Sequence, residues 1–162
     1  MENCAAGQSL SQQWRRKQLM NTLTAPSQLE IMAEIHKLFE HYGPTFVDLA
    51  IGERSDLNAL LDFYGAPLRF IGSNFHMVMK DDGAITGEEG IGGEIRRLRH
   101  AQFAGSTLDK CDIKVLNAQA ALVDAVWLRE DAAGVVARFS VVYLVARTAK
   151  GWRITSAVDL SE

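Results

Sequence analysis

The 162-residue sequence contains little cysteine and little proline, and it has no long apolar run. Cys4 lies in a polar stretch and Cys111 in an expected strand, so we predict no structural disulfide and a reducing, cytoplasmic location. No apolar segment approaches the roughly 20 residues of a membrane span, and the N-terminus lacks the apolar core of a secretory signal. The formal net charge of −3 provides no overall attraction to nucleic acid or anionic lipid.

Motifs for metal, nucleotide and nucleophilic chemistry are also missing. His36 and His41 are five residues apart, which puts them on different faces of a helix, and no His-Glu-x-x-His motif occurs. The stretch "GEEGIGGE" contains neither Gly-x-Gly-x-x-Gly nor a Walker lysine, and there is no Gly-x-Ser-x-Gly elbow. We therefore predict no metal site and no cofactor.

The first 26 residues differ in composition from the rest of the chain. They are rich in Gln, Ser and Asn and carry Arg15, Arg16 and Lys17 against Glu2 alone. We predict a disordered tail over residues 1–26 and one domain over residues 27–162. Met20 is an alternative start of the natural chain, a hypothesis that the intact mass of the natively expressed protein would test.

Three helices are predicted in the first two thirds of the domain. The first opens with a capping box of Ser27 and Glu30 and should kink or break at Pro44. The second follows Ser55-Asp56 and has Leu57, Leu60, Leu61 and Tyr64 on one face, with Gly65 as its stop. The third opens with a second capping box, Thr86 with Glu89, and buries Ile91, Ile95 and Leu98.

The remainder of the chain reads mainly as strands. A first strand or hairpin begins at Pro67, and from Asp112 onward four segments rich in Val, Ile, Leu and aromatic residues are separated by short turns. We predict an α+β fold in which a curved antiparallel sheet wraps around the three helices. The segment "VVARFSVVYLVA" is apolar on both faces, so both faces of the sheet should be buried. The helices can bury one face, and we expect a second copy of the chain to bury the outer face in a homodimer.

The order of elements resembles the nuclear transport factor 2-like superfamily, which includes SnoaL-like cyclases and ketosteroid isomerases. The segments that carry the resemblance are "SDLNALLDFYGAPLRFIG", "TGEEGIGGEIRRL" and the closing strands with their "KGWRI" turn. The resemblance implies a cystatin-like cone with a cavity for a small apolar ligand, and commonly a dimer. It also implies a catalytic carboxylate at the end of the first strand, where this sequence has Gly72. The two oxyanion donors of the isomerases fall near Thr45, one turn after Tyr42, and near Tyr143.

His76 is one candidate for acid–base chemistry, because a histidine in a cavity titrates near neutral pH. Its alternative role is at the edge of a hairpin or at a dimer contact. Arg69 is a candidate clamp for a ligand carboxylate, or it extends along the sheet surface. The basic run of Arg96, Arg97, Arg99 and His100 favours a solvated helix face.

Tyr143 and Asp159 are the second candidate pair. Folding the last two strands about residues 148–151 sets Val141 opposite Asp159 and Tyr143 opposite Ala157, on one face. A carboxyl group beside a phenol can hydrogen-bond an oxyanion, although Asp159 near the C-terminus can also be simply solvated. Three functions stay open: ligand binding, a cofactor-free acid–base enzyme, or an interaction module with a filled cavity. The predicted ligand contacts are Tyr42, Phe46, Arg69, His76, Phe139, Tyr143 and Asp159, and the catalytic candidates among them are His76, Tyr143 and Asp159.

Overall fold

The first helix, α2 (Gln28–Ile51), is the longest helix of the structure, a computed structural model that describes residues 26–161. The predicted capping box is present: the Glu30 N–H donates to Ser27 Oγ at 3.2 Å, and the Ser27 N–H donates to the Glu30 carboxylate at 2.7 Å. Gly52 ends the helix with φ of 91°, a conformation that favours glycine. Apart from Pro26, the predicted tail and Met20 lie outside the described residues.

The helix passes through Pro44 without ending, so of the predicted kink or break, the break is wrong. Proline inside a helix costs about 3 kcal/mol, whereas each large apolar side chain contributes about 1.5–3 kcal/mol when fully buried. Phe46 and Leu49 lie beyond Pro44 and are buried at 7 % and 0 % exposure. Their burial outweighs the cost of the proline.

The other predicted helices are shorter than expected. The second is a 3₁₀ helix, η1 (Leu57–Asp62), and Tyr64 lies in the following strand rather than on a helix face. The third is divided into α3 (Asp82–Thr86) and α4 (Ile91–His100). The predicted Thr86–Glu89 box is wrong, because Asp81 caps α3 and Thr86 becomes the last residue of that helix. A side chain on Gly90, which precedes α4, would collide with the Ala84 carbonyl, and the close helix junction therefore requires glycine.

Residues 26–161 form one curved, open sheet of six strands in the order β2-β1-β6-β5-β4-β3. The strands are β1 (Tyr64–Ile71), β2 (His76–Met79), β3 (Phe103–Asn117), β4 (Ala120–Asp131), β5 (Val136–Thr148) and β6 (Gly151–Asp159). The predicted α+β class and curved sheet are confirmed. The sheet is not antiparallel throughout, since β1 pairs with β6 in parallel. These two strands are far apart in the sequence, and a long connection permits parallel pairing.

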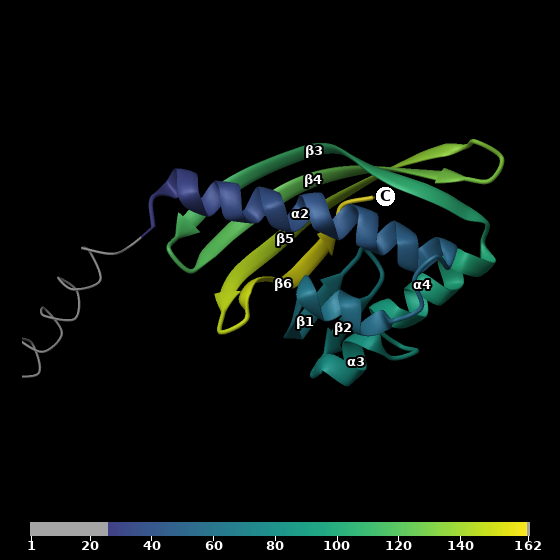
Figure 1. Ribbon diagram of the computed structural model, residues 1–162, viewed down its shortest axis with the longest axis horizontal. Helices are drawn as coiled ribbons and strands as arrows, with labels where there is room; N and C mark the ends of the chain where they lie inside the picture. The colour runs from purple at the N-terminus through teal and green to yellow at the C-terminus, as the bar shows by residue number, and fades with distance from the viewer. Residues whose placement is uncertain (1–25, 162) are drawn as a thin grey trace, which may run out of the picture.

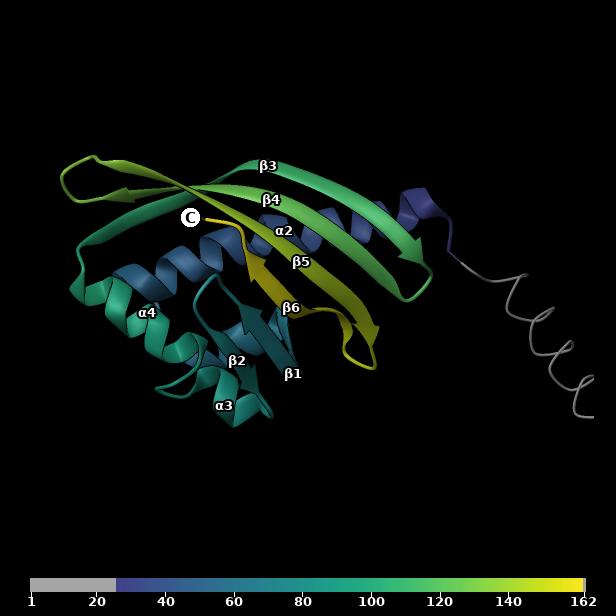
Figure 2. The ribbon, with the colours of Figure 1, turned by 180° about the vertical axis from the view of Figure 1, so that it is seen from behind.

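The helices lie on the concave side of the sheet. Figures 1 and 2 show α2 running beneath the curve of β3 to β6, with α3 and α4 grouped near β1 and β2. The predicted register of β5 and β6 is confirmed, with Val141 opposite Asp159 and Tyr143 opposite Ala157. The inner faces of the strands and the apolar stripe of α2 form one core. Among the helices of residues 26–161, none has both the length and the apolar character that a bilayer span requires.

Candidate functional site

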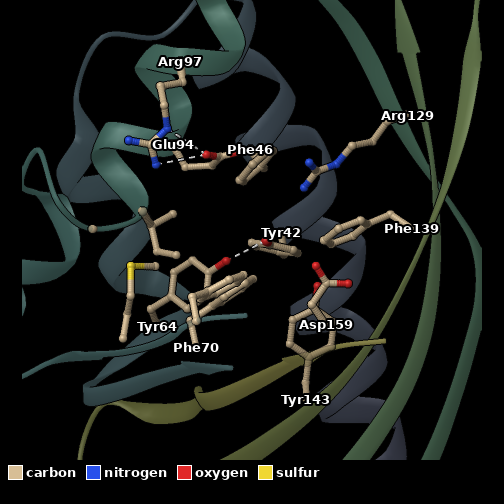
Figure 3. A pocket seen from close by; sticks show the side chains of 14 residues that line it. Tyr42, Phe46, Tyr64, Phe70, Glu94, Arg97, Arg129, Phe139, Tyr143 and Asp159 are labelled. Carbon is tan, nitrogen blue, oxygen red and sulfur yellow. Dashed lines mark hydrogen bonds and ion pairs between the residues drawn. The ribbon is translucent and has the colours of Figure 1, made fainter. Parts of the chain in front are cut away.

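A cavity of about 380 Å³ lies between the concave face of the sheet and helices α2 and α4 (Figure 3). Its volume falls within the range of roughly 300–1,000 Å³ that is typical of small-molecule sites. Seven aromatic side chains line it: Tyr42, Phe46, Tyr64, Phe70, Phe75, Phe139 and Tyr143. Four charged side chains reach it as well: Glu94, Arg97, Arg129 and Asp159. The cavity is therefore largely apolar with a few polar groups.

All three tyrosines of the chain line this cavity. Tyr42 comes from the buried stripe of α2, Tyr64 is the first residue of β1, and Tyr143 lies on the inner face of β5. The hydroxyls of Tyr42 and Tyr64 are hydrogen-bonded at 2.6 Å, and Trp127 Nε1 donates to the Tyr143 hydroxyl at 3.1 Å. We call Tyr42, Tyr64 and Tyr143 the tyrosine cluster.

The tyrosine cluster has more hydroxyl protons than it has contacts between its own hydroxyls. Its three hydroxyls carry three protons, and the contact between Tyr42 and Tyr64 uses one of them. If the Tyr143 and Tyr42 hydroxyls were also hydrogen-bonded to each other, the two bonds would use two of the three protons. Trp127 adds a further donor from outside and takes up an acceptor position on Tyr143. At least one O–H group therefore has no acceptor within the cluster.

Burial raises the pKa of all three tyrosines above the ordinary value of 10.0. For Tyr42 and Tyr143, repulsion from a neighbouring tyrosinate is the next cause, and the positive charge of Arg129 acts weakly in the opposite direction. The cluster consequently presents neutral hydroxyl donors at every physiological pH.

The charged groups of the cavity differ in how they are bonded. Glu94 and Arg97, both on α4, form an ion pair at 3.1 Å. Asp159, the last residue of β6, accepts the Ser161 N–H at 2.8 Å. Arg129, on β4, lies over the rings of Phe139 and Phe46 at 4.4 and 5.8 Å from their centroids. Figure 3 shows that Arg129 and Asp159 enter the cavity from the sheet, whereas Glu94 and Arg97 enter it from α4.

The structure brings five of the predicted ligand contacts to this cavity: Tyr42, Phe46, Phe139, Tyr143 and Asp159. Arg69 and His76 are exposed and do not line it. In the β1–β2 hairpin Phe70 pairs with Met77, and both line the cavity, so the neighbouring pair of Ile71 and His76 faces the other side. Within residues 26–161, no group of three or more His, Cys, Asp or Glu side chains is arranged as a metal site.

Two prominent residues of the cavity were missing from the prediction. The sequence pattern places Tyr64 on the apolar face of a helix, although its position just before Gly65-Ala66-Pro67 is equally compatible with the start of a strand. Arg129 lies in a strand of alternating buried and half-buried residues, and the same alternation places it on the face of Trp127. Counting every second residue from Val123 places Arg129 on the inner face of the strand, and this pattern is visible in the sequence.

A family described as NTF2-like protein (DUF6841) matches residues 33–162 of the sequence. The chain belongs to this NTF2-like family. The resemblance stated from the sequence is thereby confirmed, and the match begins at Ala33 within α2 and includes the whole sheet and every residue that lines the cavity. Among curated proteins, none is a significant match to the sequence.

Solved structures with the same fold share little sequence with this family member. An NTF2-like protein with a cystatin-like fold from Novosphingobium aromaticivorans has 20 % identity and a TM-score of 0.59, covering 95 % of this chain and 90 % of that chain. A candidate aromatic ring hydroxylase from the same organism has 19 % identity and a TM-score of 0.61, covering 85 % and 94 %. A candidate scytalone dehydratase, also from that organism, has 14 % identity and a TM-score of 0.57, covering 81 % and 83 %. At these identities the likeness establishes the cystatin-like fold alone.

Proposed function

We propose that the cavity binds a small aromatic molecule and that the tyrosine cluster donates a hydrogen bond to an oxygen of that molecule. The observation that carries the proposal is the surplus O–H group in the cluster, on tyrosines that are 3–7 % exposed. A buried donor without an acceptor costs about 1–3 kcal/mol, so an acceptor oxygen from a ligand stabilises the complex.

The lining of the cavity supports an aromatic ligand. Aromatic pairs gain about 0.5–1.5 kcal/mol beyond the area they bury, and seven aromatic side chains surround the space. The open volume of about 380 Å³ argues against the alternative of an interaction module whose own side chains fill the cavity. The candidate aromatic ring hydroxylase among the structural neighbours is consistent with an aromatic ligand on this fold, although function does not follow from fold.

The test is isothermal titration calorimetry with two probes of one shape. 2-Acetylnaphthalene carries an acceptor oxygen, and 2-isopropenylnaphthalene has a CH₂ group in its place. We expect the ketone to bind about 3- to 10-fold more tightly, the range of one neutral hydrogen bond. The variants Tyr64→Phe and Tyr143→Phe keep the rings and remove one proton at either end of the cluster, and at least one of them should abolish the preference. Equal binding of the two probes, or binding of neither, contradicts the proposal.

Asp159 favours a second candidate, a cofactor-free acid–base enzyme. The isomerases carry a carboxylate where this chain has Gly72, but Asp159 brings one to the same cavity as the hydroxyl donors. With a bound ketone, the Asp159 carboxylate would take a proton from the carbon next to the carbonyl, the enolate oxygen would accept from a tyrosine, and the proton would return. NMR in D₂O would then show deuterium entering the methyl group of 2-acetylnaphthalene, and Asp159→Asn would stop it. If deuterium enters only at the uncatalysed rate, the enzyme candidate is wrong and ligand binding remains the proposed function.

A further inference from the structure

We infer that Arg129 recognises an anionic group of the ligand, which makes the ligand class an aromatic or largely apolar carboxylate. The inference rests on the proposed function, because it names the chemistry of the molecule that the cavity takes. Arg129 reaches the cavity from β4, beside the aromatic rings that would hold the apolar part of such a molecule (Figure 3).

The bonding of Arg129 differs from that of comparable arginines. Four arginines in residues 26–161 are half-buried, and three of them bond to protein acceptors. Arg96 pairs with Glu88, Arg147 with Glu34, and Arg153 with the Leu61 and Trp152 carbonyls. No hydrogen bond or ion pair joins Arg129 to another residue within 26–161, although its guanidinium carries five N–H donors. The half-buried arginine that lacks a protein acceptor is thus the one that lines the cavity.

Cation–π contact holds the guanidinium in place without using its donors. The group lies 4.4 Å from the ring centroid of Phe139 and 5.8 Å from that of Phe46. Cation–π attraction to a ring face uses none of the N–H groups as hydrogen-bond donors to an acceptor atom, so they remain available. A planar carboxylate matches that edge with two parallel hydrogen bonds. The arrangement is therefore organised for a carboxylate before any ligand binds.

The other charges of the cavity determine how such a ligand is oriented. Glu94 is neutralised by Arg97, so it leaves Arg129 free to act on a ligand. Asp159 is a second negative group in the cavity and forms no ion pair with Arg129. A carboxylate beside Asp159 would be repelled, which favours the orientation that puts the carboxylate on Arg129. The same repulsion disfavours ligands with more than one negative charge.

The experiment compares 2-naphthoate with 2-acetylnaphthalene, which differ by one oxygen in place of a methyl group. Calorimetry on the full chain should show that Arg129→Gln weakens 2-naphthoate about 10-fold or more, the range of a charged hydrogen bond. The same variant should change the affinity for 2-acetylnaphthalene by less than about 3-fold, because the ketone does not need the charge. Arg129→Lys, which retains the charge without the fork, should retain part of the affinity for 2-naphthoate.

Arg138→Gln is the matched control. Arg138 lies on the neighbouring strand β5, is exposed, pairs with Asp109 at 3.1 Å, and does not line the cavity. Its loss removes the same charge from the same sheet and should leave the affinities for both probes unchanged. An affinity for 2-naphthoate that survives Arg129→Gln overturns the inference. If Arg129→Gln lowers the affinity for both probes equally, the inference is also overturned, because Arg129 then has a structural role.

The two levels of the proposal fail in different ways. If the wild-type chain binds 2-acetylnaphthalene but not 2-naphthoate, the carboxylate inference is wrong and the proposed function stands. If neither probe binds, the proposed function is wrong and the role of Arg129 falls with it.

Discussion

Because the chain has three tyrosines and all three lie in one buried cluster, any tyrosine signal from the folded protein reports on that cluster alone. Their raised pKa values make ultraviolet titration a direct test of the site. In the unfolded chain we expect tyrosinate absorbance at 295 nm to appear with a midpoint near pH 10, as for free tyrosine. In the folded chain the absorbance should stay flat through that pH. One tyrosine titrating near pH 10 in the folded protein would show that the cluster is open to water.

The same shift has a consequence for stability, with a defined sign. Below about pH 10 neither state ionises its tyrosines, so the buried hydroxyls cause no pH dependence there. Above that pH the unfolded chain loses protons that the folded chain retains, and the free energy of unfolding falls by up to about 1.4 kcal/mol per pH unit for each tyrosine. Tyr64→Phe should reduce this alkaline slope by one tyrosine's share, measured by urea unfolding between pH 9 and 11. An unchanged slope would mean that Tyr64 is not shielded.

Single residues were predictable from the sequence where periodicity alone determines which way a side chain points. Tyr42 and Phe46 follow from the helical stripe, and Tyr143 and Asp159 follow from the two-residue period of the last hairpin. His76 is a candidate because of its chemistry alone, and the direction of its side chain depends on the register of a four-residue strand that the sequence does not reveal. The role of Arg129 depends on an absent partner, which becomes visible only when the tertiary contacts are known.

At the scale of elements, one contact joins the long helix to the end of the sheet. Glu34 of α2 accepts the Trp152 indole N–H at 2.7 Å and pairs with Arg147 at 3.1 Å, so α2 is attached to β5 and β6. Glu34→Ala leaves the N–H of Trp152, a buried residue, without its acceptor, and we expect a loss of about 1–3 kcal/mol in the free energy of unfolding.

Glu40→Ala is the matched control for that variant. Glu40 lies on the same helix and is exposed, so its replacement should change stability by less than about 0.5 kcal/mol. Urea unfolding of both variants at neutral pH gives the comparison. Equal stability of the two would mean that the contact between α2 and β6 contributes nothing.

The elements also show what determined the success of prediction. The Ser27 capping box and the pairing of β5 with β6 are local, since each involves residues close in sequence, and both were correct. The continuity of α2 through Pro44 depends on the burial of Phe46 and Leu49 in a core that includes distant strands. Parallel pairing of β1 with β6 joins residues about 90 positions apart, and no local pattern encodes it.

At the scale of the whole molecule, no helix of residues 26–161 covers the outer face of the sheet. All helices of the described residues lie on the concave side, as Figures 1 and 2 show. The outward positions alternate with the buried ones along β4, β5 and β6, and several of them are apolar and half-buried: Leu122, Val142, Leu144 and Val158. Lys110 and Asp124, which pair at 2.7 Å, lie on the same face towards the β3 edge.

We propose that a second copy of the chain covers this face. Apolar outward residues with polar groups beside them match the anatomy of a protein interface, and two identical faces can pair about a twofold axis. Light scattering after gel filtration should give twice the 17.9 kDa mass of the chain. Leu144→Lys places a charge among the apolar outward residues and should convert the dimer to a monomer, because an unpaired buried charge is costly.

Leu29→Lys is the control that separates an interface effect from a general one. Leu29 lies at the start of α2 and is 78 % exposed, so its replacement introduces the same charge away from the sheet. The variant should remain dimeric. A wild-type chain that scatters as a 17.9 kDa monomer at micromolar concentration contradicts the proposal, and a dimer that survives Leu144→Lys locates the interface elsewhere. Either result would leave the cavity on the concave side unaffected, because the two faces share strands but point in opposite directions.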